Sequence, residues 1–457
     1  MLNIVNPATG EVIKKLECDR GPAIAEKFKR AKLAQSSWAK TSLAVRAEAI
    51  AKFRAALERD KERLAKVLTD EVGKPISQSK NEINGTLARI DFFLAQTAAV
   101  LKEEVVFKDP EQKLEEVISH EPLGVIANIS AWNYPYFVGS NVFVPALLTG
   151  NAVLYKPSEF STLTGLAITE HLHASGIPKD VFIPVVGDGA TGSELLAQPI
   201  NGVFFTGSYG TGKRIAEAVA GRMIKMQLEL GGKDPAYVCD DANVSAAAES
   251  LADGAFYNNG QSCCSVERIY VHEKVYDAFV AHFIKNVSSF VVGDPQAEKT
   301  YIGPLTRAPQ LKVVEDQVKD ASAKGAKLLS GGKRLTDRTG NYFAPTVFSQ
   351  VNHSMELMKE ESFGPIIGIQ KVKDDDEALR LMNDTAYGLT AGVYTPDKAR
   401  ARKILEQTNA GSVYWNCCDR VSPRLPWSGR GHSGIGATLS TYGIQTFLQP
   451  KAWHLRG

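Results

Sequence analysis

The stretch GVFFTGSYGTGK, residues 202–213, decides the fold because it joins an apolar strand to a helix through a glycine-rich turn. The run Gly202–Thr206 has the apolar and aromatic character of a buried strand. Ser208 stands where it can begin the following helix as its N-cap. The free amides and the positive end of such a helix favour a phosphate group. The Gly207–Gly212 loop is therefore a candidate phosphate site, and a capped helix without a ligand is the alternative.

Strands followed by helical segments continue on both sides of this stretch. In the first set, strands are predicted at Gly124–Ile129, Ala152–Tyr155, Val181–Val186 and Gly202–Thr206. A second set begins near Asp234, with strands predicted at Ile269–Val271, Gly392–Tyr394 and Ser412–Trp415 and helices at Val244–Tyr257, Val275–Val292, Glu377–Met382 and Ala399–Thr408. This alternation indicates two α/β units, the first a Rossmann-like doubly wound parallel sheet. Ligands of such sheets bind beyond the carboxyl ends of the strands.

The two flanking regions have different patterns. Ala23–Glu104 is helical, and we expect its many charged residues to form a solvated face. Val105–Glu121 alternates like a hairpin with Asp109-Pro110 at the turn, a device suited to pairing subunits. Tyr442–Leu455 is predicted to be a final strand whose apolar residues need a partner, such as the hairpin of a second subunit.

Composition excludes several classes of function. The 457 residues are 44% hydrophobic and 23% charged, as in an ordinary globular protein of two or three domains. A net charge of +2 without a long Lys/Arg run predicts no nucleic-acid partner. Neither a membrane span nor a signal peptide is indicated. The six cysteines form neither a disulfide framework nor a zinc pattern, so we expect no metal and a cytoplasmic location.

A second glycine-rich motif precedes the first in the chain. Gly187-Asp188-Gly189-Ala190-Thr191-Gly192 satisfies GxGxxG between a strand and a helix. The acidic residue expected about 20 positions later is missing, since that neighbourhood reads Thr-Gly-Lys. Direct binding of a pyrophosphate and an ordinary connecting loop both remain open for this motif.

A cysteine lies on a turn between a predicted helix and strand, in YNNGQSCCSVER, residues 257–268. Gly260 lets the backbone of this turn approach a bound group closely. The Cys263 thiol becomes a nucleophile if amides, a helix end or a cation lower its pKa. A lone cysteine is otherwise a small buried apolar residue.

Seven motifs in order make the chain resemble the NAD(P)-dependent aldehyde dehydrogenase superfamily over nearly its full length. They are Ala131-Trp-Asn-Tyr-Pro135, Lys156-Pro-Ser-Glu159, Phe205-Thr-Gly-Ser208, Glu229-Leu-Gly-Gly-Lys233, Gly260-Gln-Ser-Cys263, Glu361-Ser-Phe-Gly-Pro365 and Pro426-Trp-Ser-Gly429. The resemblance implies oxidation of an aldehyde to the acid by an enzyme. It also implies an NAD-binding domain (1–104 and 123–230), a catalytic domain (231–432) and oligomerisation segments (105–122 and 442–457) of a homodimer or homotetramer.

The resemblance assigns three catalytic residues. Cys263 is the nucleophile that forms a thiohemiacetal, while Cys264 is a pocket wall. Asn133 and the backbone amide of Cys263 donate to the oxyanion, a contribution of about 3–4 kcal/mol per donor. Glu229, 34 residues before Cys263, activates the water that hydrolyses the thioester. Without the family context, Asn133 would be a turn former and Glu229 a surface charge.

Cofactor contacts carry over in the same way. The residues implied are Lys156, Glu159, Gly207, Ser208, Gly212, Trp132, Glu361 and Phe363. Lys156 and Glu159 would hold the adenosine ribose, and the loop around Ser208 the pyrophosphate. A carboxylate at Glu159 accepts from a free 2′-hydroxyl and repels a 2′-phosphate, which favours NAD, with NADP as the alternative.

The substrate pocket is less familiar. Its implied walls are Tyr134, Val138, Asn141, Ser262, Cys264, Val421 and Trp427. Asn141 replaces an aromatic residue common in enzymes for small aliphatic aldehydes, which suggests a wider or more polar pocket. Arg420 and Arg424 either draw an anionic aldehyde or pair with Asp419 or another subunit, and we favour the pairing. A non-catalytic protein on this fold and a thiol esterase are the alternatives to the dehydrogenase.

Overall fold

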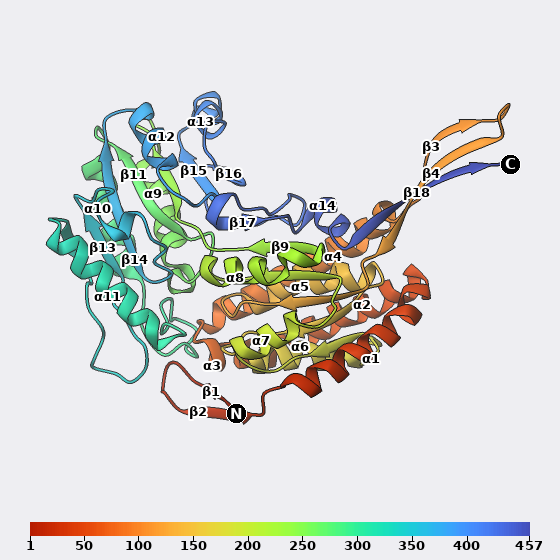
Figure 1. The fold of residues 1–457 in the computed structure, drawn as a ribbon. Helices are drawn as coiled ribbons and strands as arrows, with labels where there is room; N and C mark the ends of the chain where they lie inside the picture. The colour runs from red at the N-terminus through yellow and green to blue at the C-terminus, as the bar shows by residue number, and fades with distance from the viewer.

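The structure, a computed structural model, describes residues 1–457 and contains two α/β lobes side by side (Figure 1). The sheet of the first lobe has the order β17-β9-β8-β5-β6-β7. Its strands are β5 (Val125–Ile129), β6 (Ala152–Lys156), β7 (Phe182–Pro184), β8 (Gly202–Thr206), β9 (Lys225–Glu229) and β17 (Gly434–Ile435). All pairs are parallel except β17 with β9. The predicted doubly wound sheet is confirmed.

Helices cover both faces of this sheet. Val125, Ala127 and Ile129 of β5 belong to one apolar cluster with α1, α7 and α8, whereas Ile126 belongs to another with α2 to α6. This split follows from the alternation of side chains along a strand. The helices are α1 (Gly21–Lys40), α2 (Leu43–Arg59), α3 (Lys61–Val72), α4 (Ile76–Val100), α5 (Pro135–Leu148), α6 (Thr162–Ala174), α7 (Gly189–Leu196) and α8 (Tyr209–Val219).

The second lobe contains a seven-stranded sheet in the order β12-β13-β14-β11-β10-β15-β16, antiparallel only between β12 and β13. The strands are β10 (Asp234–Val238), β11 (Val266–His272), β12 (Lys327–Ser330), β13 (Thr346–Ser349), β14 (Ile366–Val372), β15 (Thr390–Tyr394) and β16 (Ser412–Trp415). Its helices are α9 (Val244–Phe256), α10 (Tyr276–Ser289), α11 (Ala308–Ala323), α12 (Asp375–Asn383) and α13 (Lys398–Leu405).

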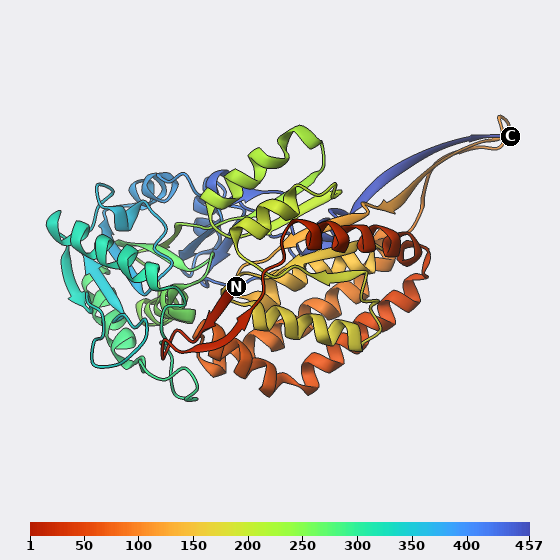
Figure 2. The same cartoon turned by 60° about the horizontal axis from the view of Figure 1, so that its bottom comes forward.

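A three-stranded arm projects from the first lobe (Figure 2). It is formed by β3 (Glu104–Asp109), β4 (Leu114–Pro122) and β18 (Leu448–Arg456). The predicted hairpin is present, but the tail pairs with the hairpin of its own chain along its whole length rather than with that of a second subunit. The tail was also predicted to be strand from Tyr442. Instead α14 (Ser440–Gln445) precedes β18, and Ser440 Oγ accepts from the amide of Tyr442.

The remaining elements are short. They are β1 (Leu2–Val5), β2 (Val12–Leu16) and the 3₁₀ turns η1 (Ala220–Arg222), η2 (Tyr257–Gly260), η3 (Glu356–Met358) and η4 (Gly431–Ser433). No helix combines the length and apolar character needed to cross a bilayer.

Several charged side chains of the N-terminal helical region, Ala23–Glu104, are buried, so the expectation of a purely solvated face was wrong. The buried residues are Arg46, Glu71, Lys74, Glu82 and Arg89. Glu71 accepts from the amides of Leu163 and Thr164 at the start of α6, and burial raises the pKa of Glu71 to about 7. Helical periodicity does not distinguish a charge that caps a neighbouring helix from one that faces water.

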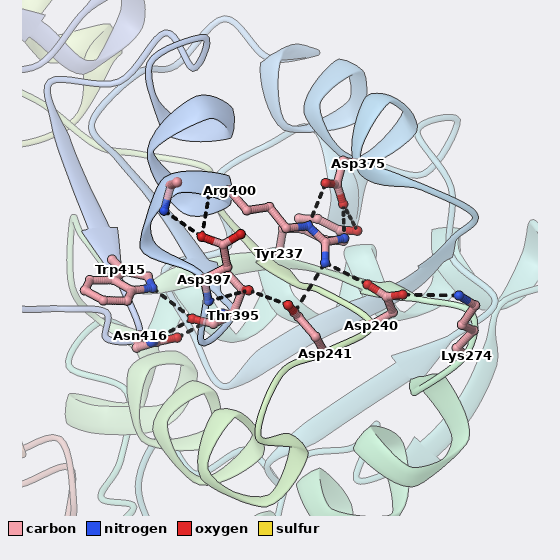
Figure 3. A network of polar contacts seen from close by, with 11 residues as sticks. Tyr237, Asp240, Asp241, Lys274, Asp375, Thr395, Asp397, Arg400, Trp415 and Asn416 are labelled. Atoms are coloured by element: carbon pink, nitrogen blue, oxygen red, sulfur yellow. Dashed lines mark hydrogen bonds and ion pairs between the residues drawn. The ribbon is translucent and has the colours of Figure 1, made fainter.

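An arginine connects separate chain segments in the second lobe (Figure 3). Arg400 of α13 forms ion pairs with Asp240 (2.8 Å), Asp241 (3.3 Å) and Asp375 (2.6 Å). The hydroxyl of Tyr237 also donates to Asp375. These contacts join α13 and α12 to the loop that leaves β10. Hydrogen bonding to Arg400 lowers the pKa of Asp240 to about 2.

Candidate active site

Cys263 lies on a turn with an unusual backbone, between η2 and β11. Asn258, Asn259 and Gly260 have φ values of 52°, 60° and 70°, a left-handed run. A Cβ at Gly260 would lie 2.3 Å from the carbonyl oxygen of Gly364, so only glycine fits. The Asn258 side chain donates to the carbonyl oxygens of Asn133 (3.2 Å) and Gln261 (3.1 Å). These bonds fix the backbone that presents Cys263, and asparagine tolerates the left-handed region better than most residues.

Cys263 and Glu229 line one cavity of about 680 Å³. They come from different lobes: Glu229 ends β9, and Cys263 precedes β11. All seven predicted pocket residues also line this cavity, namely Tyr134, Val138, Asn141, Ser262, Cys264, Val421 and Trp427. The remaining walls include Asn81, Arg89, Tyr257, Asp419, Arg420 and Arg424. The cavity therefore contains a thiol, a carboxylate and several polar side chains.

Glu229 is buried at the edge of this cavity. Its carboxylate accepts from Gln227 Nε2 (3.1 Å) and from the hydroxyl of Thr438. Burial raises the pKa of Glu229, and the Thr438 and Gln227 bonds oppose that shift. A carboxyl with a raised pKa is a stronger base once it is ionised.

Asn133 is buried immediately beside the cysteine turn. Its Nδ2 donates to the carbonyl oxygen of Gln261 at 3.2 Å, two residues before Cys263. An amide nitrogen has two N–H groups, so this bond occupies one and leaves one. Asn133 itself is not among the residues that line the cavity.

A second cavity of about 700 Å³ lies at the carboxyl ends of β5, β6 and β8. Five of the eight predicted cofactor residues line it: Trp132, Lys156, Glu159, Gly207 and Ser208. Ser208 is the N-cap residue of α8, but its side chain accepts no amide and instead donates to Thr211 Oγ1 at 3.2 Å. The first amides of α8 are therefore left without a side-chain cap, as an anion site requires.

The other three predicted cofactor residues occupy different places. Gly212 packs against Leu230, since a Cβ there would approach a methyl carbon of Leu230 to 2.5 Å. Glu361 accepts from the amide of Gly232 at 3.0 Å, and burial raises the pKa of Glu361 to about 8. Phe363 meets Trp132 edge to face at 5.5 Å. Gly212 therefore allows α8 to pack closely against Leu230. Phe363 does not line the second cavity but contacts Trp132, which does.

The GxGxxG motif is a capped helix start in this structure. Asp188 accepts from the amides of Ala190 (3.1 Å) and Thr191 (3.3 Å) and pairs with Arg20. The first amides of α7 are thus occupied by Asp188 of the motif itself. This favours the ordinary connecting loop over direct pyrophosphate binding, although Gly189 and Gly192 line the second cavity.

Comparison with known proteins now identifies the family. Residues 1–453 match the model of the aldehyde dehydrogenase family. The chain belongs to this family. A curated relative, the 3,6-anhydro-alpha-L-galactose dehydrogenase of Streptomyces coelicolor, is 33% identical, and the alignment covers 100% of this chain and 93% of the relative. The predicted enzyme class, an NAD(P)-dependent aldehyde dehydrogenase, is confirmed.

Solved structures support the same conclusion. An Escherichia coli structure described as an NADP dependent enzyme has a TM-score of 0.97 and 30% identity, covering 100% of this chain and 95% of that one. An NAD-dependent aldehyde dehydrogenase from Sinorhizobium meliloti has a TM-score of 0.96 and 32% identity, covering 100% and 91%. Both nucleotides therefore occur among the structural neighbours of this aldehyde dehydrogenase.

Two buried ion pairs that the sequence analysis missed hold the site loops of this aldehyde dehydrogenase. Glu82 pairs with Lys74 and accepts from the amides of Tyr136 (2.8 Å) and Phe137 (3.4 Å) at the start of α5. The ammonium of Lys74 lies 3.7 Å above the ring of Tyr134. This pair fixes the helix start that follows Asn133.

The second ion pair joins Lys233 and Glu267 at 2.5 Å. Glu267 accepts from the amides of Ser362 and Phe363, and Lys233 also donates to the hydroxyl of Ser362. The segment that carries Glu361 and Phe363 is thereby tied to β11. Lys233 closes a recognised motif, but nothing in the sequence indicates that its partner is Glu267.

Cys264, the residue after Cys263, interacts with Asp419. The Cys264 thiol donates to Asp419 Oδ1 at 2.9 Å. Hydrogen bonding to Cys263 and burial raise the pKa of Cys264 well above the usual thiol value, which keeps Cys264 protonated. For Arg420 and Arg424 the expected pairing with the Asp419 carboxylate was wrong, while pairing with another subunit stays a prediction. Arg420 reaches only the Asp419 carbonyl (3.3 Å), because the carboxylate faces Cys264.

Proposed function

We propose that this aldehyde dehydrogenase acts through Cys263, with Glu229 and Asn133 in supporting roles. The single observation that carries the proposal is that Cys263 and Glu229 line the same cavity, although they come from different lobes. The Cys263 thiolate attacks the aldehyde carbon and forms a thiohemiacetal. The neighbouring Cys264, held as a thiol by Asp419, does not compete.

Asn133 stabilises the charge that develops on the aldehyde oxygen. Its amide is already fixed beside Cys263 by the bond to Gln261, and its second N–H is available to donate. The backbone amide of Cys263 is the other donor. A preorganised donor of this kind is worth about 3–4 kcal/mol of transition-state stabilisation.

Glu229 acts on the acyl-enzyme thioester. Ionised Glu229 removes a proton from water, and the resulting hydroxide attacks the thioester carbon and releases the acid and the Cys263 thiolate. Thr438 and Gln227 hold the carboxylate in place. The raised pKa of Glu229 makes it a better proton acceptor than an exposed carboxylate.

The second cavity fits a nicotinamide dinucleotide. Its size, the uncapped start of α8 and the Lys156–Glu159 pair (3.9 Å) provide an anion site and a ribose site at the strand ends. When bound, the dinucleotide supplies the two-electron acceptor of the reaction. Because Glu159 accepts hydrogen bonds and repels a 2′-phosphate, we propose NAD as the preferred form. Trp132, a wall of this cavity, meets Phe363 edge to face, and we propose that this pair lies between the bound dinucleotide and Cys263.

The remaining expectations stay proposals about the whole protein. The NAD-binding domain comprises 1–104 and 123–230, the catalytic domain 231–432, and the oligomerisation segments 105–122 and 442–457. The arm carries exposed apolar side chains at Val105, Val106, Phe107, Trp453 and Leu455, which supports assembly into a homodimer or homotetramer. All six cysteines are free, in keeping with a reducing cytoplasm.

The test compares Cys263→Ala with Cys264→Ala. NADH production from an aldehyde panel should fall at least about 1,000-fold in Cys263→Ala, because the covalent route is lost. Cys264→Ala should keep turnover within about tenfold, and both variants should bind NAD with similar affinity in a fluorescence titration. Comparable turnover by Cys263→Ala would contradict the assignment.

A further inference from the structure

Arg89 on α4 is the most unusual charged residue of the cavity that contains Cys263. It is only 5% exposed, and its guanidinium carbon lies 3.6 Å from the centre of the Phe137 ring. Its one hydrogen bond to the protein runs from Nη1 to the carbonyl oxygen of Gly85 at 3.3 Å. Nε is buried without any partner. No carboxylate lies within ion-pair distance, and the other buried arginines, Arg46 and Arg268, each donate to several acceptors, most of them backbone carbonyls.

The absence of a partner is costly for a buried cation. Burial lowers the pKa of Arg89 to about 10, so the guanidinium remains charged at neutral pH. A buried charge without hydrogen bonds is normally excluded from folded proteins unless function requires it. The Nε–Nη2 edge that Gly85 leaves free is the edge that binds a carboxylate through two parallel hydrogen bonds.

The acids of the same cavity are engaged elsewhere. Glu229 accepts from Thr438 and Gln227, and Asp419 accepts from Cys264. The third acid, Asp253, accepts from the hydroxyl of Tyr301. Arg420 and Arg424 also line the cavity and form no ion pair with a carboxylate. The cavity therefore has unpaired positive charge on one buried and two exposed side chains.

A second buried polar residue of the cavity is Asn141 on α5, which is 4% exposed and whose Oδ1 has no hydrogen-bond partner. This oxygen is an acceptor and a carboxylate supplies no donor, so Asn141 does not distinguish a charged from a neutral aldehyde. Arg89 does: an apolar aldehyde would leave its guanidinium unsatisfied, at a cost above the roughly 1–3 kcal/mol that is typical of a neutral buried group.

We infer that the substrate is an aldehyde that carries a carboxylate, with Arg89 binding the carboxylate while the aldehyde carbon meets Cys263. The inference rests on the proposed function of this cavity. Arg89 contributes specificity rather than chemistry: its fork matches the two oxygens of a carboxylate, and stacking on Phe137 fixes its plane. The exposed arginines raise the local concentration of the anion.

The test measures NADH production from two series, ω-oxo acids of three to six carbons and unbranched neutral aldehydes of the same lengths. The readout is the ratio of kcat/KM between the best acid and its neutral counterpart, which any general loss of activity leaves unchanged. We expect a ratio above about 10 for the unmodified enzyme and a fall of about 30- to 100-fold in Arg89→Met, from the loss of a charged hydrogen-bonded contact. Arg89→Lys should recover part of the ratio.

Two arginine variants serve as controls. Arg402→Met removes an exposed arginine of α13 that pairs with Glu406 and is not a wall of the cavity, so it should leave the ratio unchanged. Arg424→Met tests attraction at the mouth and should change the ratio by less than about fivefold, with a dependence on ionic strength. A larger effect from Arg424→Met than from Arg89→Met would overturn the inference.

Other outcomes separate this inference from the proposed function. Equal kcat/KM for the two series in the unmodified enzyme, or a parallel loss of both in Arg89→Met, would overturn the role of Arg89 and leave aldehyde oxidation standing. In that case Arg89 only compensates the negative charges of Glu229 and Asp419. Loss of NADH formation with every aldehyde in the unmodified enzyme would contradict the proposed function itself.

Discussion

Cys263 and Cys264 show how adjacent identical side chains acquire different chemistry. Both cysteines line the cavity, but Cys263 is half-buried, whereas Cys264 is buried and donates to Asp419. The raised pKa of Cys264 follows from a side-chain hydrogen bond with Cys263 and from burial. The environment of Cys264, rather than its residue type, therefore keeps it a thiol.

Glu229 predicts an acid limb in the pH dependence of turnover. A base acts in its ionised form, and burial raises the pKa of Glu229, so kcat should fall as pH drops through a value above the ordinary carboxyl range. We expect Glu229→Gln to remove the limb together with most of the turnover. Asp419→Asn is the matched control, since burial also raises the pKa of Asp419 in the same cavity. If Asp419→Asn lost the limb while Glu229 was intact, Asp419 rather than Glu229 would be the base.

At the scale of elements, buried ion pairs position the site. The Lys74–Glu82 pair caps the start of α5, and the Lys233–Glu267 pair holds the segment of Phe363. Both glutamates accept backbone amides that would otherwise be unsatisfied. The site is thus built on ends of helices and strands, and its geometry depends on charges that do not touch the reacting atoms.

Removing one partner of such a pair should be strongly destabilising. Glu82→Gln leaves the Lys74 ammonium buried without its counter-ion, which we expect to lower the free energy of unfolding of the first lobe by about 3–5 kcal/mol. The measurement is the shift in urea midpoint followed by tryptophan fluorescence. The control, Glu58→Gln, breaks an exposed i,i+4 pair with Arg54 and should change stability by less than about 0.5 kcal/mol. Equal small shifts in both variants would show that the buried pair contributes nothing.

At the scale of the whole molecule, the arm stands out because little of the same chain packs against it. Its three strands extend away from both cores, and its edge strands β3 and β18 have no further neighbours. Val105, Phe107 and Trp453 are 57%, 48% and 42% exposed. Exposed edges that carry apolar side chains are ready to bury against another chain.

Charge placed on the arm should therefore reduce the oligomeric state. If the proposed dimer or tetramer forms through the arm, Val105→Lys combined with Phe107→Glu should convert it into smaller species, measured as molar mass by light scattering after size exclusion. Val45→Lys, at a residue of α2 that is 51% exposed, is the control and should leave the mass unchanged. An unchanged mass in the arm variant would exclude the arm from the interface.

The extent of prediction from sequence also differs with scale. Strand and helix alternation was sufficient for the doubly wound sheet, because apolar runs such as Ala152–Lys156 leave little choice of structure. The pocket walls followed from motif positions, and all seven line the cavity with Cys263. Family resemblance was needed to distinguish Glu229 from a surface charge.

What could not be predicted depends on contacts between distant residues. Glu82 and Arg89 lie on α4, and Lys74 lies in the loop before it, within a region of many solvated charges. Only the packing of this region against α5 shows that all three are buried. The tail pairs within its own chain because the arm places Leu448–Arg456 beside Leu114–Pro122. Periodicity describes one segment at a time, whereas the buried charges and the pairing of the tail arise from contacts between two segments.

The most direct measurement of the central claim is a single-turnover experiment with Glu229→Gln, followed by mass spectrometry of the quenched protein. If Cys263 forms the thioester and Glu229 activates water, the variant should release about one equivalent of NADH per active site and then stop, with the acyl mass on the peptide that contains Cys263. Continued turnover at the unmodified rate, or an acyl group on any other residue, would contradict the account.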